Sequence, residues 1–399
     1  MYVMEVVLLN HDYPPFIFGG VGTFVHELAK GLSRNGVKVH VITGYNEDIS
    51  SMGSFGFQRS TEDDIDVLRF SYPNIPPRHT VFQVWNIKKI LKVIRDLDVD
   101  VIHGQCSATY PALPLLRREA PVLVTFHTSP MMQKIASTQS IFRGGSFRDF
   151  WTNLVGYHAY HFAFLKELQG SDAAVTVSRA LKSEILAEMG EKYADKIQYI
   201  HNGVDLQSLD KEYEEAETGA TESEKTILFA GRLFWLKGAL SIIEMAYLLQ
   251  KNKTKFKIIV HGTGPLFNKM REYISSLGLR NIDLKGFATK PQLMNSMKQC
   301  AFVAIPSMYE ACPMILLESM CLGKIPLMLK LPFSSELTED GKYGILGDGV
   351  KSLTDRLITL ENTHSLSQLS NKIRIFARNL YNMDKVTQKY IAMYRDIFS

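Results

Sequence analysis

Two glutamates, Glu310 and Glu318, stand on either side of a predicted helix start. The apolar run 300–305 before them is typical of a buried strand, and Pro313 follows at a position where a first-turn helix proline is favoured. A helix start carries unpaired N–H groups and a partial positive charge. We therefore predict that the backbone of residues 311–315 binds an anion or a set of hydroxyls between the two carboxylates. The alternative is an ordinary strand, turn and amphipathic helix with surface glutamates.

Two basic residues in a glycine-bounded turn form a second candidate site. Arg232 and Lys237 lie in the segment G-R-L-F-W-L-K-G that starts at Gly231, between a predicted strand at 226–230 and a predicted helix that ends near residue 250. An arginine supplies a forked donor and a lysine supplies a point charge, a combination that suits two phosphates. Two cations in a loop are otherwise ordinary solvated side chains.

Glycines also open the first predicted helix of the chain. Gly19, Gly20 and Gly22 follow the predicted strand 3–9 after nine intervening residues, and glycines let a backbone approach a ligand closely. A dinucleotide fingerprint would instead read G-x-G-x-x-G directly after the strand. The observed G-G-x-G therefore disfavours a site for NAD.

Two further loops follow predicted buried strands. His127 ends the strand 121–126, and Gly262 and Gly264 follow the strand 256–261. Ligands bind outside the carboxyl ends of the strands in open parallel sheets, so both loops are expected at a ligand crevice. A lone histidine in a loop is otherwise structural.

Aspartate pairs of the form D-x-D raise the question of a divalent cation. Asp64 and Asp66 form one pair, and Asp96, Asp98 and Asp100 form two overlapping pairs. A metal-binding pair of this type follows an apolar strand, whereas the last two pairs precede one. We interpret all of them as solvated ends of strands and helices, with metal binding as the minor alternative.

Length and composition restrict the class of protein. The 399 residues favour two domains, 46% of them are apolar, and a net charge of +4 gives no reason to expect a nucleic-acid partner. Cys106, Cys300, Cys312 and Cys321 lie in or beside apolar segments and are expected to be reduced thiols of a cytoplasmic protein. The first nine residues resemble a strand and not a signal peptide, and no apolar run reaches the ~18 residues that a membrane span needs.

The pattern of apolar runs and helical periodicity predicts an α/β architecture that starts twice. Residues 46–64 are expected to be a loop, and the acid-rich segment 206–225 is expected to be a linker. The segment 365–398 is expected to be helical. The predicted strands are 3–9, 37–43, 66–70, 99–103, 121–126, 173–177, 196–200, 226–230, 256–261, 282–285, 300–305, 325–329 and 343–346.

Five motifs, taken in order, resemble those of the retaining glycosyltransferases of family 4. They are the G-G-V-G of residues 19–22 after Tyr-Pro-Pro, F-H-T around His127, N-G-V-D at 202–205, G-R-L-x-x-x-K-G at 231–238, and the E-x7-E that joins Glu310 to Glu318. The resemblance implies two Rossmann-like doubly wound domains that face each other across a cleft, the GT-B arrangement. It places the acceptor-side domain at 1–205 and the nucleotide-sugar domain at 206–379, with a helix at about 380–399 packed back onto the first.

The resemblance also implies roles for individual residues. Arg232 and Lys237 would bind the diphosphate without a metal ion, Glu310 would meet hydroxyls of the donor sugar, Glu318 would hold the ribose, and His127 would lie near the reacting sugar. The expected catalytic residues are therefore His127, Arg232, Lys237 and Glu310. The expected donor-binding residues are Gly19, Gly20, Gly22, Gly231, Gly262, Gly264, Phe287, Ala311, Cys312, Pro313, Met314, Ile315 and Glu318.

The implied reaction is the transfer of a hexose from a UDP-, GDP- or ADP-sugar to a sugar, lipid-linked or polyol acceptor. Phe18 stands where glycogen and starch synthases usually carry a lysine, and Ala311-Cys312 departs from the family's usual pair in the sugar pocket. A glucan synthase, a nucleotide-sugar epimerase of the same fold and a non-catalytic sugar-nucleotide-binding protein remain alternatives. The acceptor determinants are expected at 46–60 and 128–160. The base, the sugar, the acceptor, the oligomeric state and peripheral membrane contact stay open.

Overall fold

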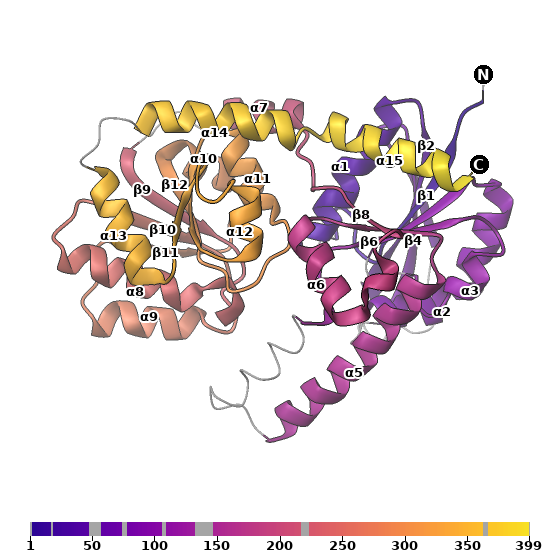
Figure 1. Ribbon diagram of the computed structural model, residues 1–399, viewed down its shortest axis with the longest axis horizontal. Helices are drawn as coiled ribbons and strands as arrows, with labels where there is room; N and C mark the ends of the chain where they lie inside the picture. The colour runs from indigo at the N-terminus through magenta and orange to yellow at the C-terminus, as the bar shows by residue number, and fades with distance from the viewer. Residues whose placement is uncertain are drawn as a thin grey trace. The chain divides into compact units, whose positions relative to one another are not determined.

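The structure is a computed structural model that describes residues 2–16, 19–47, 57–73, 78–105, 109–131, 147–216, 223–361 and 366–398. The chain divides into two compact units, residues 1–203 with 383–399 and residues 204–382 (Figure 1). The sequence placed the divisions after residues 205 and 379. The last helix belongs to the first unit.

The first unit is built on an eight-stranded sheet with the order β3-β4-β2-β1-β5-β6-β7-β8. All neighbouring strands are parallel except the edge strand β3, which runs antiparallel to β4. The strands are β1 (Glu5–Leu9), β2 (Lys38–Glu47), β3 (Phe57–Glu62), β4 (Ile65–Pro73), β5 (Val101–Gln105), β6 (Val122–Phe126), β7 (Ala173–Thr176) and β8 (Ile197–Tyr199).

Helices cover both faces of this sheet. α1 (Gly20–Arg34) and α15 (Met383–Phe398) pack against each other on one face, while α2 (Arg78–Leu97), α3 (Leu113–Leu116) and α5 (Phe147–Gly170) lie on the other (Figure 1). α6 (Arg179–Met189) and the 3-10 helix η2 (Glu191–Tyr193) precede β8. The contact between α1 and α15 is close, since a Cβ atom at Gly31 would lie 2.3 Å from Thr387 Oγ1.

The predicted loop at 46–64 is wrong, because it contains the strand β3. Asp63 and Asp64 have φ angles of 49° and 61°, so they form a left-handed two-residue turn of the kind that joins antiparallel strands. β3 is polar and largely exposed at the sheet edge, which is why it lacks the apolar alternation that identifies other strands.

The second unit has a six-stranded, wholly parallel sheet with the order β11-β10-β9-β12-β13-β14. This is the order of a Rossmann-type doubly wound sheet, in which the chain reverses its direction of winding between β9 and β12. The strands are β9 (Ser223–Ala230), β10 (Lys257–His261), β11 (Ile282–Gly286), β12 (Cys300–Ile305), β13 (Ile325–Leu329) and β14 (Ile345–Gly347).

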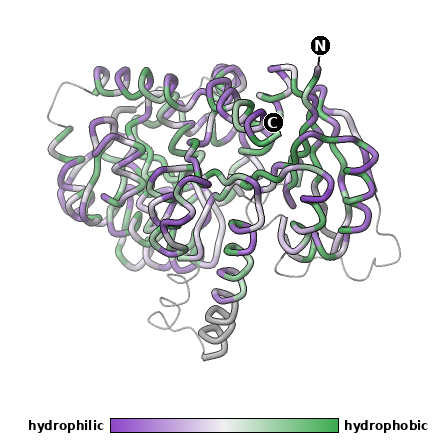
Figure 2. The backbone as a smooth tube through the Cα atoms, turned by 45° about the vertical axis from the view of Figure 1, so that its right-hand side comes forward, coloured by the Kyte–Doolittle hydropathy of each residue, from purple (hydrophilic) through white to green (hydrophobic). Residues whose placement is uncertain are grey.

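Helices again flank this sheet on both faces, with α8, α9 and α13 on one and α7, α10, α11 and α14 on the other (Figure 1). Figure 2 shows hydrophobic strands inside each unit and helices that alternate between hydrophobic and hydrophilic residues. The helices are α7 (Leu206–Glu215), η3 (Trp235–Lys237), α8 (Ala239–Lys251), α9 (Phe267–Ser276), α10 (Lys290–Gln299), α11 (Met314–Cys321), α12 (Pro332–Leu337), α13 (Val350–Glu361) and α14 (Leu366–Leu380).

The predicted linker at 206–225 is also wrong, because α7 and the start of β9 occupy most of it. The Asp205 side chain caps α7 by accepting hydrogen bonds from the backbone of Gln207 and Ser208. Leu209 is buried, and Asp210 pairs with Arg378 of α14. The acidic residues are therefore the solvated face of a packed helix.

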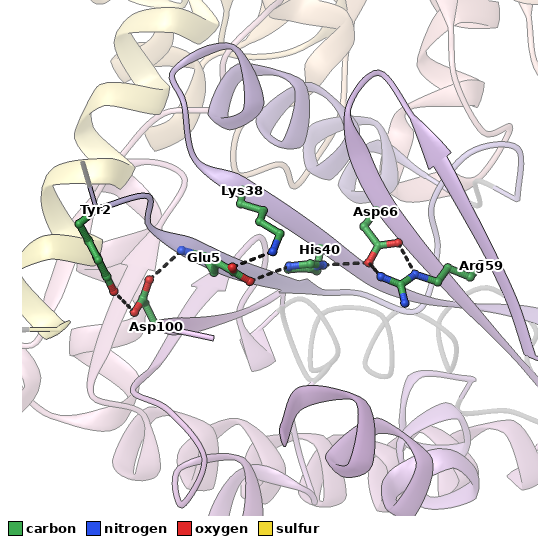
Figure 3. Close-up of polar contacts among 7 residues, drawn as sticks. All are labelled: Tyr2, Glu5, Lys38, His40, Arg59, Asp66 and Asp100. Atoms are coloured by element: carbon green, nitrogen blue, oxygen red, sulfur yellow. Dashed lines mark hydrogen bonds and ion pairs between the residues drawn. The ribbon is translucent and has the colours of Figure 1, made fainter. Parts of the chain in front are cut away.

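A line of polar contacts crosses the amino-terminal end of the first sheet (Figure 3). His40 lies between two carboxylates, with Nε2 3.1 Å from Glu5 Oε2 and Nδ1 2.9 Å from Asp66 Oδ2. Both contacts are hydrogen bonds when both ring nitrogens carry protons. Asp66 also binds Arg59 in a bidentate pair, and Asp100 accepts a hydrogen bond from the Glu5 backbone. These two D-x-D aspartates therefore stabilise strands of the sheet.

The described residues contain no group of three or more His, Cys, Asp or Glu side chains arranged to hold a metal ion. Among the described helices, none is long and apolar enough to cross a membrane. Cys300, Cys312 and Cys321 are buried free thiols, while Cys106 and Phe18 lie outside the described residues, as do 48–56 and 132–146 of the expected acceptor regions.

Candidate active site

Three loops meet at the carboxyl ends of β9, β10 and β12 in the second unit. The loop after β9 pairs with the loop after β10, since Gly231 N donates to His261 O (3.0 Å) and Leu233 N donates to Thr263 O (2.9 Å). It also joins the loop after β12, because Met308 N donates to Leu236 O (2.8 Å). The winding of the sheet reverses here, so this is the edge where a ligand crevice is expected.

Glycines allow these loops to approach so closely. Gly262 has a φ of 147°, and a Cβ atom there would lie 1.8 Å from Gly231 O. Gly264 (φ 156°) and Gly238 (φ 72°) are equally constrained, with Cβ positions 2.5 Å from Leu233 O and 2.1 Å from Pro306 O. At Gly231 itself a Cβ would meet no atom within 4 Å. Sterics therefore require glycine at three of these four positions.

Lys237 and Glu310 form an ion pair in this arrangement, with Nζ 2.5 Å from Oε1. Ser307 Oγ donates a second hydrogen bond to the same carboxylate oxygen at 2.9 Å. The Glu310 side chain is only 12% exposed, whereas that of Lys237 is 39% exposed. Arg232, in the same loop, is exposed and its guanidinium lies 5.9 Å from the centre of the Phe234 ring. The structure thus brings together a lysine and a glutamate for which the resemblance implies separate roles.

The helix start expected at Pro313 is displaced by one residue. α11 begins at Met314, and Pro313 is its N-cap in an extended conformation (φ −72°, ψ 126°). The N–H groups of Leu316 and Leu317 bond to Pro313 O, so those of Met314 and Ile315 precede the first intrahelical bonds. Ala311 and Cys312 are buried directly before the helix. Gly323, with a φ of 79°, follows the last turn of α11, where a glycine readily adopts this conformation.

Glu318 is a buried residue of α11. It pairs with Lys290, whose Nζ is 2.8 Å from Glu318 Oε1. The same Nζ lies 3.4 Å from Glu212 Oε2. Burial opposes the charge on Lys290, but Glu318 and Glu212 together raise its pKa above the ordinary value. Lys290 was not singled out from the sequence. A lysine in the first turn of a helix opposes the helix dipole, and this was the signal that could have identified it.

Phe287 is 75% exposed at the carboxyl end of β11. The preceding Gly286 has a φ of 83°, and its carbonyl accepts a hydrogen bond from Gly262 N at 2.7 Å. The turn that carries the expected donor-binding residue Phe287 is therefore hydrogen-bonded to the glycine loop after β10.

The predicted residues of the first unit lie at its own carboxyl edge. Gly19 is the N-cap of α1, while Gly20 and Gly22 lie in its first turn. A Cβ at Gly22 would lie 3.0 Å from Asp12 Oδ2. Asp12 is buried and accepts a hydrogen bond from Asn10 Nδ2 at 2.8 Å. Asp12, which was not singled out from the sequence, therefore lies beside the start of α1.

His127 follows β6 and is partly buried. Its Nε2 lies 2.9 Å from Gln105 Oε1, and its ring makes an edge contact with Phe24 of α1 at 5.1 Å between centroids. Burial lowers the pKa of His127 from 6.5 to about 3. A neutral imidazole is therefore expected at physiological pH, with ring nitrogens that take part in hydrogen bonds.

Comparison with solved structures identifies the fold. A sucrose-phosphate synthase from Thermosynechococcus elongatus superposes over 99% of both chains with a TM-score of 0.77 at 14% identity. HepE of Anabaena, solved in complex with UDP and glucose, covers 98% of this chain and 99% of its own with a TM-score of 0.69 at 18% identity. The chain therefore has the GT-B fold.

Family models identify the class of enzyme. Residues 18–208 match the model described as Glycosyltransferase Family 4, and residues 210–379 match Glycosyl transferases group 1. The protein is a GT-B glycosyltransferase that resembles family 4. Among its relatives, an uncharacterised glycosyltransferase of Methanocaldococcus jannaschii is 28% identical over 80% of this chain and 79% of its own. The alpha-monoglucosyldiacylglycerol synthase of Streptococcus pneumoniae is 22% identical over 92% and 81%, respectively.

Proposed function

We propose that the protein transfers a hexose from a nucleoside-diphosphate sugar to a hydroxyl acceptor, with retention of the donor's anomeric configuration and without a metal ion. The observation that carries the proposal is the Lys237–Glu310 pair beside the start of α11, where the sheet reverses its winding. Relatives of the same fold support such a donor, since one is bound to UDP-glucose and another to ADP and acarbose.

The second unit supplies groups suited to a departing diphosphate. Lys237 carries a positive charge at the crevice, and Arg232 stands exposed in the same loop. The N–H groups of Met314 and Ile315 add donors at a helix start. Preorganised donors of this kind stabilise the charge that develops on a leaving group. These groups can take the part that a divalent cation plays in other sugar transfers.

The carboxylates at this edge argue against a double displacement, which needs a carboxylate nucleophile close to the anomeric carbon. Glu310 is engaged by Lys237 and Ser307, and Glu318 is engaged by Lys290. We assign Glu310 to donor-sugar hydroxyls and Glu318 to the ribose. The acceptor hydroxyl then attacks the anomeric carbon on the face that the diphosphate leaves. The departing phosphate oxygen accepts the proton of that hydroxyl.

Donor hydrolysis provides a test that does not require the acceptor. The enzyme is incubated in EDTA with an α-linked UDP-, GDP- or ADP-hexose, and proton NMR records the first free sugar before it mutarotates. We expect the α-anomer, formed at the same rate with and without the chelator. An initial β-anomer would contradict retention, and loss of activity that Mg²⁺ or Mn²⁺ restores would contradict metal independence.

Glu318→Gln should weaken binding of the bare nucleoside diphosphate by about tenfold. A carboxylate can accept hydrogen bonds from two ribose hydroxyls while it holds Lys290, but an amide offers one acceptor and an unwanted donor. Calorimetry measures the affinity. The matched control is Glu212→Gln, which removes the other partner of Lys290 and should change the affinity by less than about twofold. Equal affinities of the two variants for the nucleoside diphosphate would mean that Glu318 has only a structural role.

A further inference from the structure

Buried polar side chains connect His127 to the core of the first unit. Gln105 at the end of β5 is 1% exposed, and His103 and Thr125 are fully buried. Gln105 Oε1 lies 2.9 Å from His127 Nε2, and Gln105 Nε2 lies 3.0 Å from His103 Nε2. His103 Nε2 also lies 2.7 Å from Thr125 Oγ1. One side-chain amide therefore bridges two imidazole rings.

The same network continues into the last helix of the chain. Tyr394 OH lies 2.7 Å from His103 Nδ1, and Tyr390 OH lies 3.2 Å from Thr125 Oγ1. Both tyrosines are fully buried on α15, and the ring of Tyr390 also contacts that of His103. α15 thus contributes two hydroxyls to a network whose outer end is the predicted catalytic histidine.

An amide bridge couples the protonation of the two rings. One end of the Gln105 amide accepts a hydrogen bond and the other end donates one. With the carbonyl toward His127, His127 Nε2 carries a proton and donates it, while His103 Nε2 accepts. A neutral His103 then carries its proton on Nδ1 and donates it to Tyr394 OH. Burial keeps His103 neutral, because it lowers the pKa of this ring to about 3.

Replacing one residue of this network by an apolar one would leave a buried polar group without its hydrogen-bond partner, which lowers the stability of the folded protein. An aliphatic core would avoid that cost, so the presence of five connected polar groups beneath His127 needs a reason. Fixing the tautomer and orientation of a histidine that must act while neutral is such a reason.

We propose that Gln105 is a positioning residue for His127, and that Tyr394 of α15 sets the hydrogen-bond direction through His103. With Gln105 in place, the proton stays on His127 Nε2 and the lone pair stays on Nδ1. The inference that this matters for turnover rests on the proposed function, whereas the tautomer itself can be measured in the protein without substrate.

The test combines the tautomer of His127 with kinetics in Gln105→Leu and Tyr394→Phe. In the wild type, long-range ¹⁵N–¹H NMR should show His127 protonated at Nε2. Gln105→Leu should give mixed tautomers and lower kcat by about 30-fold while the KM for the donor stays within twofold. Tyr394→Phe, which removes only a hydroxyl, should lower kcat by about fivefold and shift the tautomer of His103.

The matched control is Tyr381→Phe in the second unit, where an equally buried hydroxyl donates to Leu337 O at 2.9 Å. It should lower the melting temperature as much as Tyr394→Phe does, with kcat and the tautomers unchanged. An Nε2 tautomer that persists in Gln105→Leu would overturn the proposal, even if activity falls. If the wild type transfers no sugar, the proposed function fails and the NMR comparison still decides the positioning role.

Discussion

Lys237→Ala and Arg232→Ala should each lower turnover by about a hundredfold or more, while the second unit stays folded. A charge-assisted contact to a departing diphosphate contributes roughly 3 kcal/mol to the transition state. Lys237 is 39% exposed and Arg232 is exposed, so neither substitution removes much packing. Glu310 keeps its hydrogen bond from Ser307 in the lysine variant. The assay is donor hydrolysis or transfer at saturating donor, with melting temperatures measured in parallel.

Lys342→Ala is the matched control for the loss of a lysine from an ion pair in the same unit. Lys342 Nζ lies 3.0 Å from Glu339 on the surface, away from the loops after β9, β10 and β12. Its removal should leave turnover within about twofold, because exposed pairs of this type contribute little. If the Arg232 and Lys237 variants behave like this control, the diphosphate assignment is wrong.

Gly262→Ala should destabilise the second unit by about 3 kcal/mol or more and abolish activity in the fraction that remains folded. The new Cβ would lie 1.8 Å from Gly231 O, and the φ of 147° already disfavours any side chain. The loop after β9 would have to move away, and it carries both Arg232 and Lys237. Urea unfolding and donor affinity measure the two effects.

Gly349→Ala separates this effect from a general intolerance of alanine. A Cβ at Gly349 would meet no atom within 4 Å, and its φ lies outside the left-handed region. The substitution should cost less than about 1 kcal/mol and leave donor affinity unchanged. Wild-type stability in Gly262→Ala would show that the loops after β9 and β10 are not held together as the structure has them.

Apolar runs and helical periodicity were sufficient to predict most of the local structure around the site. Glu310 precedes α11 and Glu318 lies within it as expected, and His127 does follow a buried parallel strand. Such features depend on residues close together in the chain. The β3 edge strand and α7 were missed because both are largely polar, and α3, α9, α10, α12 and α13 were not predicted.

The specific contacts of the site could not be predicted, since they join residues far apart in the sequence. Lys237 and Glu310 are 73 positions apart, and His103 and Tyr394 are 291 positions apart. No local pattern determines which lysine meets which carboxylate, because the sheet order alone brings β9 beside β12. Side-chain pairing of this kind comes from tertiary packing.

Calorimetric titration with UDP, GDP and ADP, without sugar or metal ion, measures directly whether the Arg232 and Lys237 loop binds a nucleoside diphosphate. We predict that one of the three nucleotides binds the wild type at one site per chain and that Arg232→Ala weakens that binding. A ligand at about 100 times its Kd should also stabilise the folded protein by about 2.7 kcal/mol, which a thermal shift can verify. If none of the three binds in EDTA, or if Arg232→Ala binds as tightly as the wild type, the proposed diphosphate site is contradicted.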